Sequence, residues 1–314
     1  MSYPTNQGMK LLKVIFTTIL FLAVLASIYF VIMYKKSDME KKELTDEDRK
    51  GTTGQYIKLT QGVTHYQIAG PDTGQVVILV HGFSVPYFIW DGTFEYLAKQ
   101  GFRVVRYDQF GRGLSDRPDV VYNSPLYQNQ LAELIKQLHL KTPVDLAGVS
   151  HGGKVVTDFT CSHPELVDKV ILIDPAYPYE KPADSQLYTN YYEATHGNER
   201  AAGQLADFKY PQRHPDWVAK YRVQMQYKGF RNALVSTMYN YSYNGRAANT
   251  RLNATRKPVL LIWGKEDHTV PFIFSDSVRS VLKCDFLPVD DAGHLPYIEQ
   301  ADKVNPKIAE FLKR

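Results

Sequence analysis

Residues 143–153 read PVDLAGVSHGG, and this stretch decides how the rest of the chain is interpreted. Its first half is mostly apolar, as expected for a short buried strand, and its second half holds the pattern G-x-S-x-G around Ser150. Residues 151–162 then have the length and composition of a helix. On so sharp a strand-to-helix turn, side chains at Gly148 and Gly152 would collide with the neighbouring strand and helix. We therefore interpret Ser150 as an exposed candidate nucleophile and not as a chance match in a glycine-rich turn.

Short apolar runs recur on both sides of this stretch and alternate with helix-length segments. The predicted strands are 63–69, 75–80, 102–107, 143–147, 169–173, 258–263 and 285–289, and the predicted helices include 122–138 and 151–162. Unbroken apolar runs suit strands that are buried on both faces. The alternation predicts an α/β fold with a mostly parallel central sheet flanked by helices. In such sheets the functional residues follow the carboxyl ends of the strands.

Two later strand ends carry residue types that would activate a serine. Asp267 follows the strand predicted at 258–263, and His294 follows the strand predicted at 285–289. A serine nucleophile needs a base to take its proton, and the base needs an acid to orient it. Ser150, Asp267 and His294 are therefore the candidate catalytic residues, in the chain order nucleophile, acid, base.

The backbone near Ser150 is expected to supply an oxyanion hole. The helix that begins at His151 points its first N–H groups toward the serine. A second donor is expected from the turn His81-Gly82-Phe83, which directly follows the strand predicted at 75–80. We predict that the backbone N–H groups of Phe83 and His151 bind a developing negative charge.

With these motifs in place, the sequence resembles the α/β-hydrolase superfamily from about residue 63 to residue 314, and in particular its capped serine esterases and lipases. Residues 108–118, DQFGRGLSDRP, match the D-x-x-G-x-G-x-S-D-x-P turn of that family. The resemblance implies a core made of 51–177 and 258–314, with a helical cap inserted at 178–257. It implies cleavage of a small-molecule or lipid ester through an acyl-enzyme, with no cofactor and no metal.

The sequence is compatible with two roles at each of three positions. Asp174 also follows a strand and is the acid in some relatives, although the pattern G-x-x-D-x-x-x-P favours Asp267. Trp90 occupies the place of a pocket-flanking tryptophan, but core packing is equally compatible with the sequence. The imidazole of His151 either enters the substrate pocket or packs.

Other reaction classes are weighed on the same residues. Because the candidate nucleophile is serine, the sequence argues against epoxide hydrolase and dehalogenase chemistry, which needs an aspartate. Hydrolysis of carbon–carbon bonds and hydroxynitrile lyase chemistry use the same fold and triad and remain alternatives. A non-catalytic binding protein is the third alternative, but such proteins usually lose members of the triad.

The first fifty residues differ from the rest. Residues 14–34 carry no charge, and as a helix they would span about 31 Å, enough to cross a bilayer core. We predict a short tail at 1–13, a single-pass transmembrane anchor at 14–34 and a charged linker at 35–50 that acts as a solvated tether. The alternative is a signal peptide cleaved near Ala26, but secretory apolar segments run only about 7–15 residues. The Lys and Arg residues of the linker favour a cytoplasmic C-terminal side, yet exported domains also begin in this way, so the membrane side stays open.

Composition excludes several further classes. The chain has 314 residues, of which 44% are hydrophobic and 22% charged, as in ordinary globular proteins. The formal net charge of +4 gives no reason to expect a nucleic-acid partner. Cys161 and Cys284 are too few for a thiolate metal cage or a disulfide framework. The predicted anchor favours an amphiphilic ester as substrate, such as a monoacylglycerol or a lysophospholipid.

Overall fold

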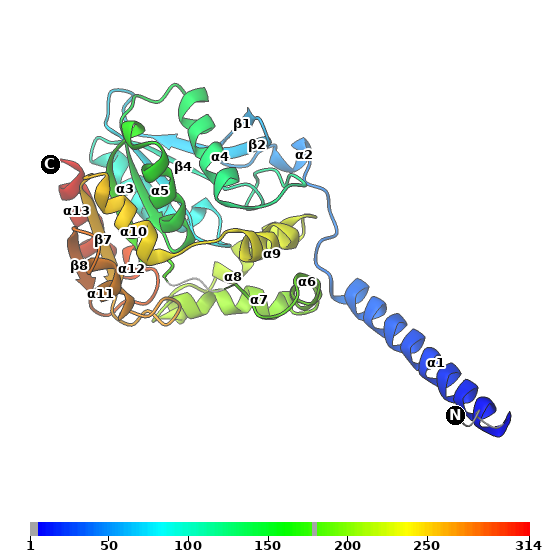
Figure 1. Cartoon of the computed structure of the whole chain (residues 1–314). Coiled ribbons are helices and arrows are strands. Elements are labelled where there is room, and N and C mark those ends of the chain that lie inside the picture. Colours follow the sequence, from blue (N-terminus) through cyan, green and yellow to red (C-terminus); the bar gives the residue numbers. More distant parts are fainter. Residues whose placement is uncertain (1–5, 178–180) are drawn as a thin grey trace.

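An eight-stranded sheet runs through the centre of the protein (Figure 1). The computed structural model describes residues 6–177 and 181–314. The strands are β1 (Gln55–Leu59), β2 (Gly62–Ala69), β3 (Val76–Val80), β4 (Arg103–Tyr107), β5 (Val144–Val149), β6 (Val167–Ile173), β7 (Val259–Gly264) and β8 (Asp285–Val289), in the spatial order β1-β2-β4-β3-β5-β6-β7-β8. β2 pairs antiparallel with β1 and β4, and the remaining pairs are parallel. The predicted α/β architecture with a mostly parallel sheet is confirmed.

Helices cover both faces of this sheet. They are α3 (Asp91–Lys99), α4 (Ser124–Gln137), α5 (His151–Ser162), α10 (Gly245–Ala254), α11 (Phe274–Arg279), α12 (Pro296–Glu299) and α13 (Ala301–Leu312). β3 shows why its sequence is apolar throughout. Val76, Ile78 and Val80 pack in the hydrophobic cluster that includes α4 and α5, whereas Val77 and Leu79 pack in the cluster that includes α3 and α13.

A second group of helices lies over the carboxyl end of the sheet (Figure 1). These cap helices are α6 (Gln186–Thr195), α7 (Gly197–Gly203), α8 (Trp217–Met225) and α9 (Phe230–Asn240), with the 3-10 turn η3 (Gln204–Asp207). α10 also falls inside the predicted cap segment 178–257, but it packs against α5 and α11 beside the sheet. The described part of that segment therefore divides into four cap helices and one core helix, while residues 178–180 lie outside the described residues.

The N-terminal helix α1 (Asn6–Ser37) is longer than the predicted span 14–34. Residues 6–13 of the predicted tail and residues 35–37 of the predicted linker continue the same helix, and residues 1–5 lie outside the described residues. α1 projects away from the sheet on the side of α6 and α9 (Figure 1). Among the described residues, α1 is the one helix that is long and apolar enough to cross a bilayer by length and composition.

Residues 38–50, which we call the strap, correct the prediction of a solvated tether. The backbone N–H groups of Lys41 and Lys42 both donate to the carbonyl of Gln226, and the N–H of Lys228 donates to the carbonyl of Lys42. The strap ends in the short helix α2 (Asp46–Arg49) against the core. The strap is therefore bound to the folded domain by its backbone and by the ion pairs of Asp38, Glu40, Glu43 and Arg49, although several of its other charged side chains are exposed.

Arg231 of α9 is the main cation that holds the strap. Its guanidinium contacts Asp38 at 2.6 Å and Glu40 at 3.6 Å, and it also donates to the Tyr34 hydroxyl of α1. All three charged side chains are at most 16% exposed. Burial raises the pKa of Glu40, and the charge of Arg231 opposes that rise. Arg231 thus offsets part of the electrostatic cost of burying Glu40.

We expect Arg231→Ala to lower the free energy of unfolding by about 3 kcal/mol, because it leaves buried carboxylates without their cation. Urea denaturation of the full chain in detergent micelles, followed by tryptophan fluorescence, measures this change. Lys228→Ala is the matched control. Lys228 forms an ion pair with Glu43 of the strap, but its side chain is 55% exposed. An exposed pair of that kind contributes at most about 1 kcal/mol. Equal effects of the two variants would contradict a stabilising strap.

Candidate active site

Ser150 lies on a sharp turn between β5 and α5. Its backbone has φ 52° and ψ −120°, an unusual conformation for a residue with a side chain. A Cβ on Gly148 would lie 2.4 Å from the carbonyl oxygen of Gly152, and one on Gly152 would lie 2.2 Å from that of Val80. The predicted collisions are thus confirmed. The two glycines let β5 and α5 meet closely enough to hold the Ser150 backbone in its turn.

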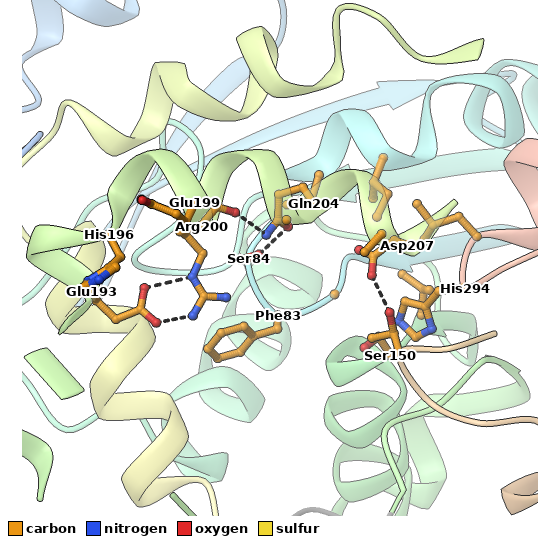
Figure 2. Close-up of a pocket in the computed structure, with 18 of the residues that line it drawn as sticks. Phe83, Ser84, Ser150, Glu193, His196, Glu199, Arg200, Gln204, Asp207 and His294 are labelled. Atoms are coloured by element: carbon orange, nitrogen blue, oxygen red, sulfur yellow. Dashed lines mark hydrogen bonds and ion pairs between the residues drawn. The ribbon is translucent and has the colours of Figure 1, made fainter. Parts of the chain in front are cut away.

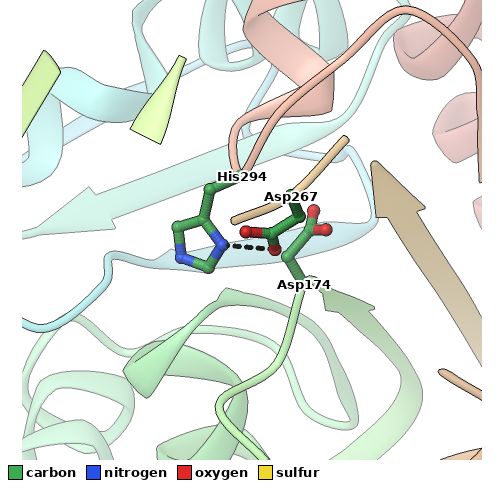
Figure 3. Close-up of side chains that lie close together, drawn as sticks. All are labelled: Asp174, Asp267 and His294. Carbon is green, nitrogen blue, oxygen red and sulfur yellow. Dashed lines mark hydrogen bonds and ion pairs between the residues drawn. The ribbon is translucent and has the colours of Figure 1, made fainter. Parts of the chain in front are cut away.

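His294 and Asp267 meet in the loops that follow β8 and β7 (Figure 3). The Nδ1 atom of His294 lies 2.7 Å from Oδ2 of Asp267, and both side chains are buried. Oδ1 of Asp267 accepts hydrogen bonds from the backbone N–H groups of Thr269 and Val270, each at 2.8 Å. Burial alone would lower the pKa of His294, but the charge and hydrogen bond of Asp267 raise it above its ordinary value of 6.5.

Asp174 is the third member of this buried cluster. One oxygen each of Asp174 and Asp267 and a ring nitrogen of His294 lie within 4.8 Å of one another. Oδ1 of Asp174 accepts from the N–H of Gly264 at 2.8 Å, whereas the hydrogen bond to His294 Nδ1 comes from Asp267. Burial and the charge of Asp267 raise the pKa of Asp174 well above its ordinary range. Its surroundings therefore favour the protonated form of Asp174.

The same three residues have the ligand types of a metal site. However, both oxygens of Asp267 are already hydrogen-bonded, Oδ2 to the imidazole and Oδ1 to two backbone N–H groups. A cation would have to replace these bonds, so the arrangement suits proton transfer better than metal binding.

The turn 81–83 is held in place by buried polar groups. Nδ1 of His81 lies 2.9 Å from the carbonyl oxygen of Gly82, and the N–H of Gln109 donates to His81 Nε2. Burial lowers the pKa of His81 to about 4, which keeps the ring neutral. The buried Arg112 donates from Nε to the carbonyl oxygen of Phe83 at 2.8 Å. Position 82 lies against Ser150, since a Cβ there would be 3.5 Å from the serine Cβ.

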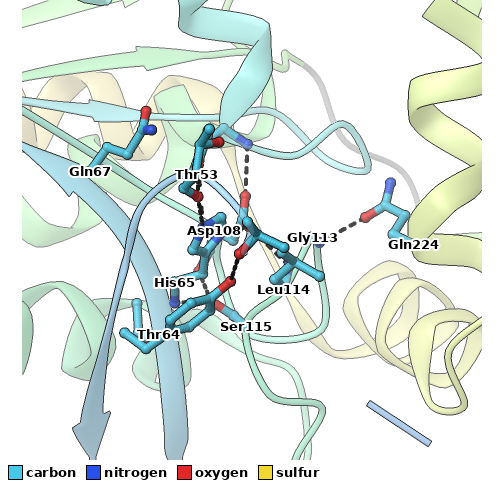
Figure 4. Close-up of polar contacts among 12 residues, drawn as sticks. Thr53, Thr64, His65, Gln67, Asp108, Gly113, Leu114, Ser115 and Gln224 are labelled. Atoms are coloured by element: carbon cyan, nitrogen blue, oxygen red, sulfur yellow. Dashed lines mark hydrogen bonds and ion pairs between the residues drawn. The ribbon is translucent and has the colours of Figure 1, made fainter. Parts of the chain in front are cut away.

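The turn at 108–118 supports this region through polar contacts around Asp108 (Figure 4). Asp108 accepts from His65 Nδ1 at 2.8 Å, from the N–H of Leu114 and from the N–H of Tyr87. Burial would raise the pKa of Asp108, but the hydrogen bond and charge of His65 overcome it and lower that pKa.

Gln224 of α8 connects the same turn to the cap. Its Oε1 accepts from the N–H of Gly113, and its Nε2 donates to the carbonyl of Ser84. One cap side chain thus ties the turn to the segment that follows Phe83.

Ser150 and His294 line one cavity of about 440 Å³ between the strand ends and the cap (Figure 2). The part of the lining that comes from the core is mostly apolar, and its apolar members are Phe83, Val85, Ile89, Val149 and Leu295. The wall contributed by α6, α7 and η3 is charged or polar, and it includes Glu193, His196, Glu199, Arg200, Gln204 and Asp207. This polar wall reaches the candidate triad, because the carbonyl oxygen of Asp207 accepts from the backbone N–H of His294 at 2.8 Å.

The polar wall was not predicted from the sequence. Arg200 donates to both carboxylate oxygens of Glu193, and Asp207 accepts from the Thr269 hydroxyl at 2.7 Å. Glu193, Arg200 and Asp207 occur at intervals of seven residues. They lie on three separate elements, α6, α7 and η3, so this regular spacing is not that of one helix, and no local signal in the sequence could have revealed them.

Trp90 and His151, the two pocket candidates from the sequence, lie outside the set of residues that lines this cavity. Trp90 is fully buried and stacks on Tyr297, with ring centroids 4.4 Å apart. The imidazole of His151 packs edge-on against Tyr241 and Tyr127, at 4.8 and 5.4 Å. Both side chains pack in the interior and do not line the pocket, because large aromatic neighbours enclose them.

The fold and the site define a class of α/β proteins in which a serine on a sharp strand-to-helix turn lies beneath a helical cap. The family model for the alpha/beta hydrolase fold matches residues 75–301, and the chain belongs to this family. The predicted resemblance is confirmed.

Curated relatives span most of the chain at low identity. The AB hydrolase superfamily protein YisY of Bacillus subtilis is 25% identical over 82% of this chain and 98% of its own length. Epoxide hydrolase 1 of Caenorhabditis elegans is 25% identical over 90% of this chain and 74% of its own length. Monoacylglycerol lipase abhd6-B of Xenopus laevis is 26% identical over 77% of this chain and 76% of its own length.

Solved structures agree on the fold. The enol-lactonase of Burkholderia xenovorans LB400 superposes with a TM-score of 0.73 at 21% identity, over 83% of this chain and all of that one. A thermophilic esterase of Thermogutta terrifontis gives a TM-score of 0.71 at 25% identity, over 82% of this chain and 98% of that one.

Proposed function

We propose that this family member is a membrane-anchored serine hydrolase that cleaves carboxylic esters. The observation that carries the proposal is the hydrogen bond between His294 Nδ1 and Asp267 Oδ2. The histidine of this pair lines the same cavity as Ser150. A serine, an imidazole and an orienting carboxylate are the parts that acyl transfer requires.

In the proposed mechanism, His294 takes the hydroxyl proton of Ser150 at Nε2 while Oγ attacks the ester carbonyl. Asp267 holds Nδ1–H, fixes the tautomer and stabilises the imidazolium that forms. The N–H groups of Phe83 and His151 bind the oxyanion. His294 then protonates the leaving alcohol and activates the water that releases the acid from the acyl-enzyme.

Ester cleavage is favoured over the epoxide chemistry named for one relative. Opening of an epoxide by a serine would leave a stable ether on the enzyme, whereas an aspartate forms an ester that water can hydrolyse, and position 150 is serine. The three-dimensional arrangement does not separate ester hydrolysis from carbon–carbon bond hydrolysis or hydroxynitrile cleavage. Those reactions are therefore included as competing outcomes of the test below.

The proposed substrate is amphiphilic. The apolar residues that the core contributes to the cavity suit an acyl chain, and the polar wall from the cap suits a polar head group. α1, interpreted as an uncleaved anchor, would keep the cavity next to a source of such lipids. One relative is a monoacylglycerol lipase, which agrees with this substrate class.

A product panel on the full chain in detergent micelles tests the proposal. It compares monoacylglycerols of increasing chain length, short soluble esters, a vinylogous diketone, a cyanohydrin and an epoxide. We expect free fatty acid as the product and higher kcat/KM on long-chain esters. Faster turnover of short soluble esters would overturn the lipid assignment, and turnover confined to another substrate class would overturn ester hydrolysis.

The pH profile provides a separate prediction. The base works only as neutral imidazole, and the pKa of His294 is raised above 6.5. Below that pKa the ring is protonated, so kcat/KM on an ester should fall about tenfold per pH unit on the acid side. Initial rates between pH 5 and 9 should place the midpoint of this limb above 6.5. A midpoint below about 6 would contradict the role of the Asp267 hydrogen bond in raising the pKa of His294.

A further inference from the structure

The apolar face of α6 is the unexplained surface that lies nearest to α1. Leu187 is 82% exposed, Tyr188 54% and Tyr192 45%. Together with Tyr191 these residues lie within about 140° of the helix circumference, so they form one continuous face. We call these four residues the α6 face. Large apolar side chains gathered on one exposed face point to a partner or a membrane.

The α6 face is continuous with α1. The Tyr191 ring packs edge-on against Phe30 at 5.4 Å and stacks on Tyr34 at 6.5 Å. α6 is the labelled element that lies closest to the end of α1 in Figure 1. Side chains of the cap and of the N-terminal helix therefore share one aromatic cluster.

This contact fixes the depth of α6 relative to a bilayer. Tyr34 is the last residue of the uncharged run, directly before Lys35 and Lys36. Phe30 lies four residues earlier, about 6 Å deeper along the helix axis. Because Tyr191 contacts both rings, it must lie at the boundary between hydrocarbon and head groups. Tyrosine is enriched at that boundary.

The strap removes the freedom that would otherwise let the domain tumble beneath its anchor. Arg231 of α9 binds Tyr34 of α1 and Asp38 and Glu40 of the strap at the same time. The cap is thus held to α1 from both α6 and α9, and the α6 face cannot turn away from the membrane without breaking these bonds.

The α6 face also borders the active-site cavity. Tyr192 and His196 both line the cavity and stack on each other with centroids 4.0 Å apart. Tyr192 is thus exposed on one side and part of the cavity lining on the other. A molecule dissolved in the outer part of the bilayer would meet these two rings before the polar wall.

We propose that the α6 face lies in the interfacial region of the bilayer that α1 spans, and that the ester substrate enters the cavity from the bilayer past Tyr192 and His196. The inference rests on the proposed function in one respect, namely that α1 remains as a membrane anchor. It names the bilayer interface as the surface that the exposed α6 side chains contact.

Fluorescence quenching by brominated lipid tests the placement directly. The full chain carrying Leu187→Trp is reconstituted into phosphatidylcholine vesicles with or without bromine on the acyl chains. Ile273→Trp is the matched control, because Ile273 is 65% exposed and directly precedes α11, at the end of the domain far from α1 (Figure 1). After subtraction of the wild-type signal, we expect bromine to quench the added tryptophan at position 187 and not at position 273.

Flotation of the same vesicles separates a failure of the α6 placement from a failure of the membrane anchor. Quenching at neither position in a chain that floats would overturn the placement of α6 while leaving the anchor and the hydrolase intact. A chain that does not float would overturn the anchor and this inference together, and fluorophosphonate labelling of Ser150 would show whether the hydrolase still stands.

Substrate entry has its own test. Leu187→Glu places a charge on the α6 face at an exposed position, where folding is not at stake. We expect turnover of a vesicle-borne monoacylglycerol to fall about tenfold, because the side chain no longer enters an apolar phase. Turnover of a soluble short ester should stay within about twofold, and Ile273→Glu should change neither rate. An equal loss on both esters, or no loss on the vesicle-borne one, would overturn entry from the bilayer.

Discussion

Ser150→Ala is expected to lower kcat on an ester substrate about 10⁶-fold, as loss of the nucleophile does in other serine triads. The reason is geometric. Ser150 is the residue at the turn between β5 and α5, with φ 52°, and it lines the cavity together with His294. Without its Oγ there is no acyl-enzyme, and only the binding and oxyanion contributions remain.

Steady-state turnover of the full chain in detergent micelles measures this loss. Ser280→Ala is a control for the substitution itself, because Ser280 is exposed at the end of α11. It should retain activity within about twofold, as surface substitutions usually do. A loss of less than about tenfold in Ser150→Ala would mean that another group attacks the substrate, and the proposed mechanism would be wrong.

Asp267→Asn is expected to reduce kcat about 10⁴-fold, since an amide at this place stabilises the wrong tautomer of the histidine base. Asp267 accepts from His294 Nδ1 through one oxygen and from two backbone N–H groups through the other. The asparagine side chain keeps the shape but loses the negative charge that stabilises the imidazolium.

Asp174→Asn is the matched comparison, because it removes a carboxyl group from the same buried cluster. We expect a loss of at most about tenfold, since burial and the charge of Asp267 raise the pKa of Asp174 and Asn can still accept from the N–H of Gly264. Parallel kcat measurements on both variants decide between the two acids. A larger loss in Asp174→Asn than in Asp267→Asn would assign the orienting role to Asp174.

Local patterns in the sequence were enough to predict those elements whose side chains are buried over their whole length. β3 could be predicted because all five of its side chains are buried, in two clusters on opposite faces. The sharp turn at Ser150 could be predicted because the pattern G-x-S-x-G lies between a recognisable strand and a recognisable helix. β1 was missed because polar Gln55 and Lys58 interrupt its apolar residues, whereas the other edge strand, β8, holds the unbroken run 286–289 and was predicted.

Features that depend on distant partners could not be predicted. The strap looks like a solvated linker because its charges have no partner nearby in sequence, and Arg231 lies almost two hundred residues away from Asp38. The polar wall of the cavity comes from cap helices whose orientation over the sheet no local pattern specifies. His151 and Trp90 follow the family pattern in position, but neighbouring aromatic rings decide that both pack in the interior.

Fluorophosphonate labelling of the full chain, wild type beside Ser150→Ala, tests the central claim most directly. The probe forms a covalent bond only with a serine that a neighbouring base activates. We predict strong labelling of the wild type, none of Ser150→Ala, and a pH dependence that follows neutral His294. A folded wild-type chain that stays unlabelled, or a Ser150→Ala chain that is labelled as strongly, would contradict the assignment of Ser150 as the nucleophile.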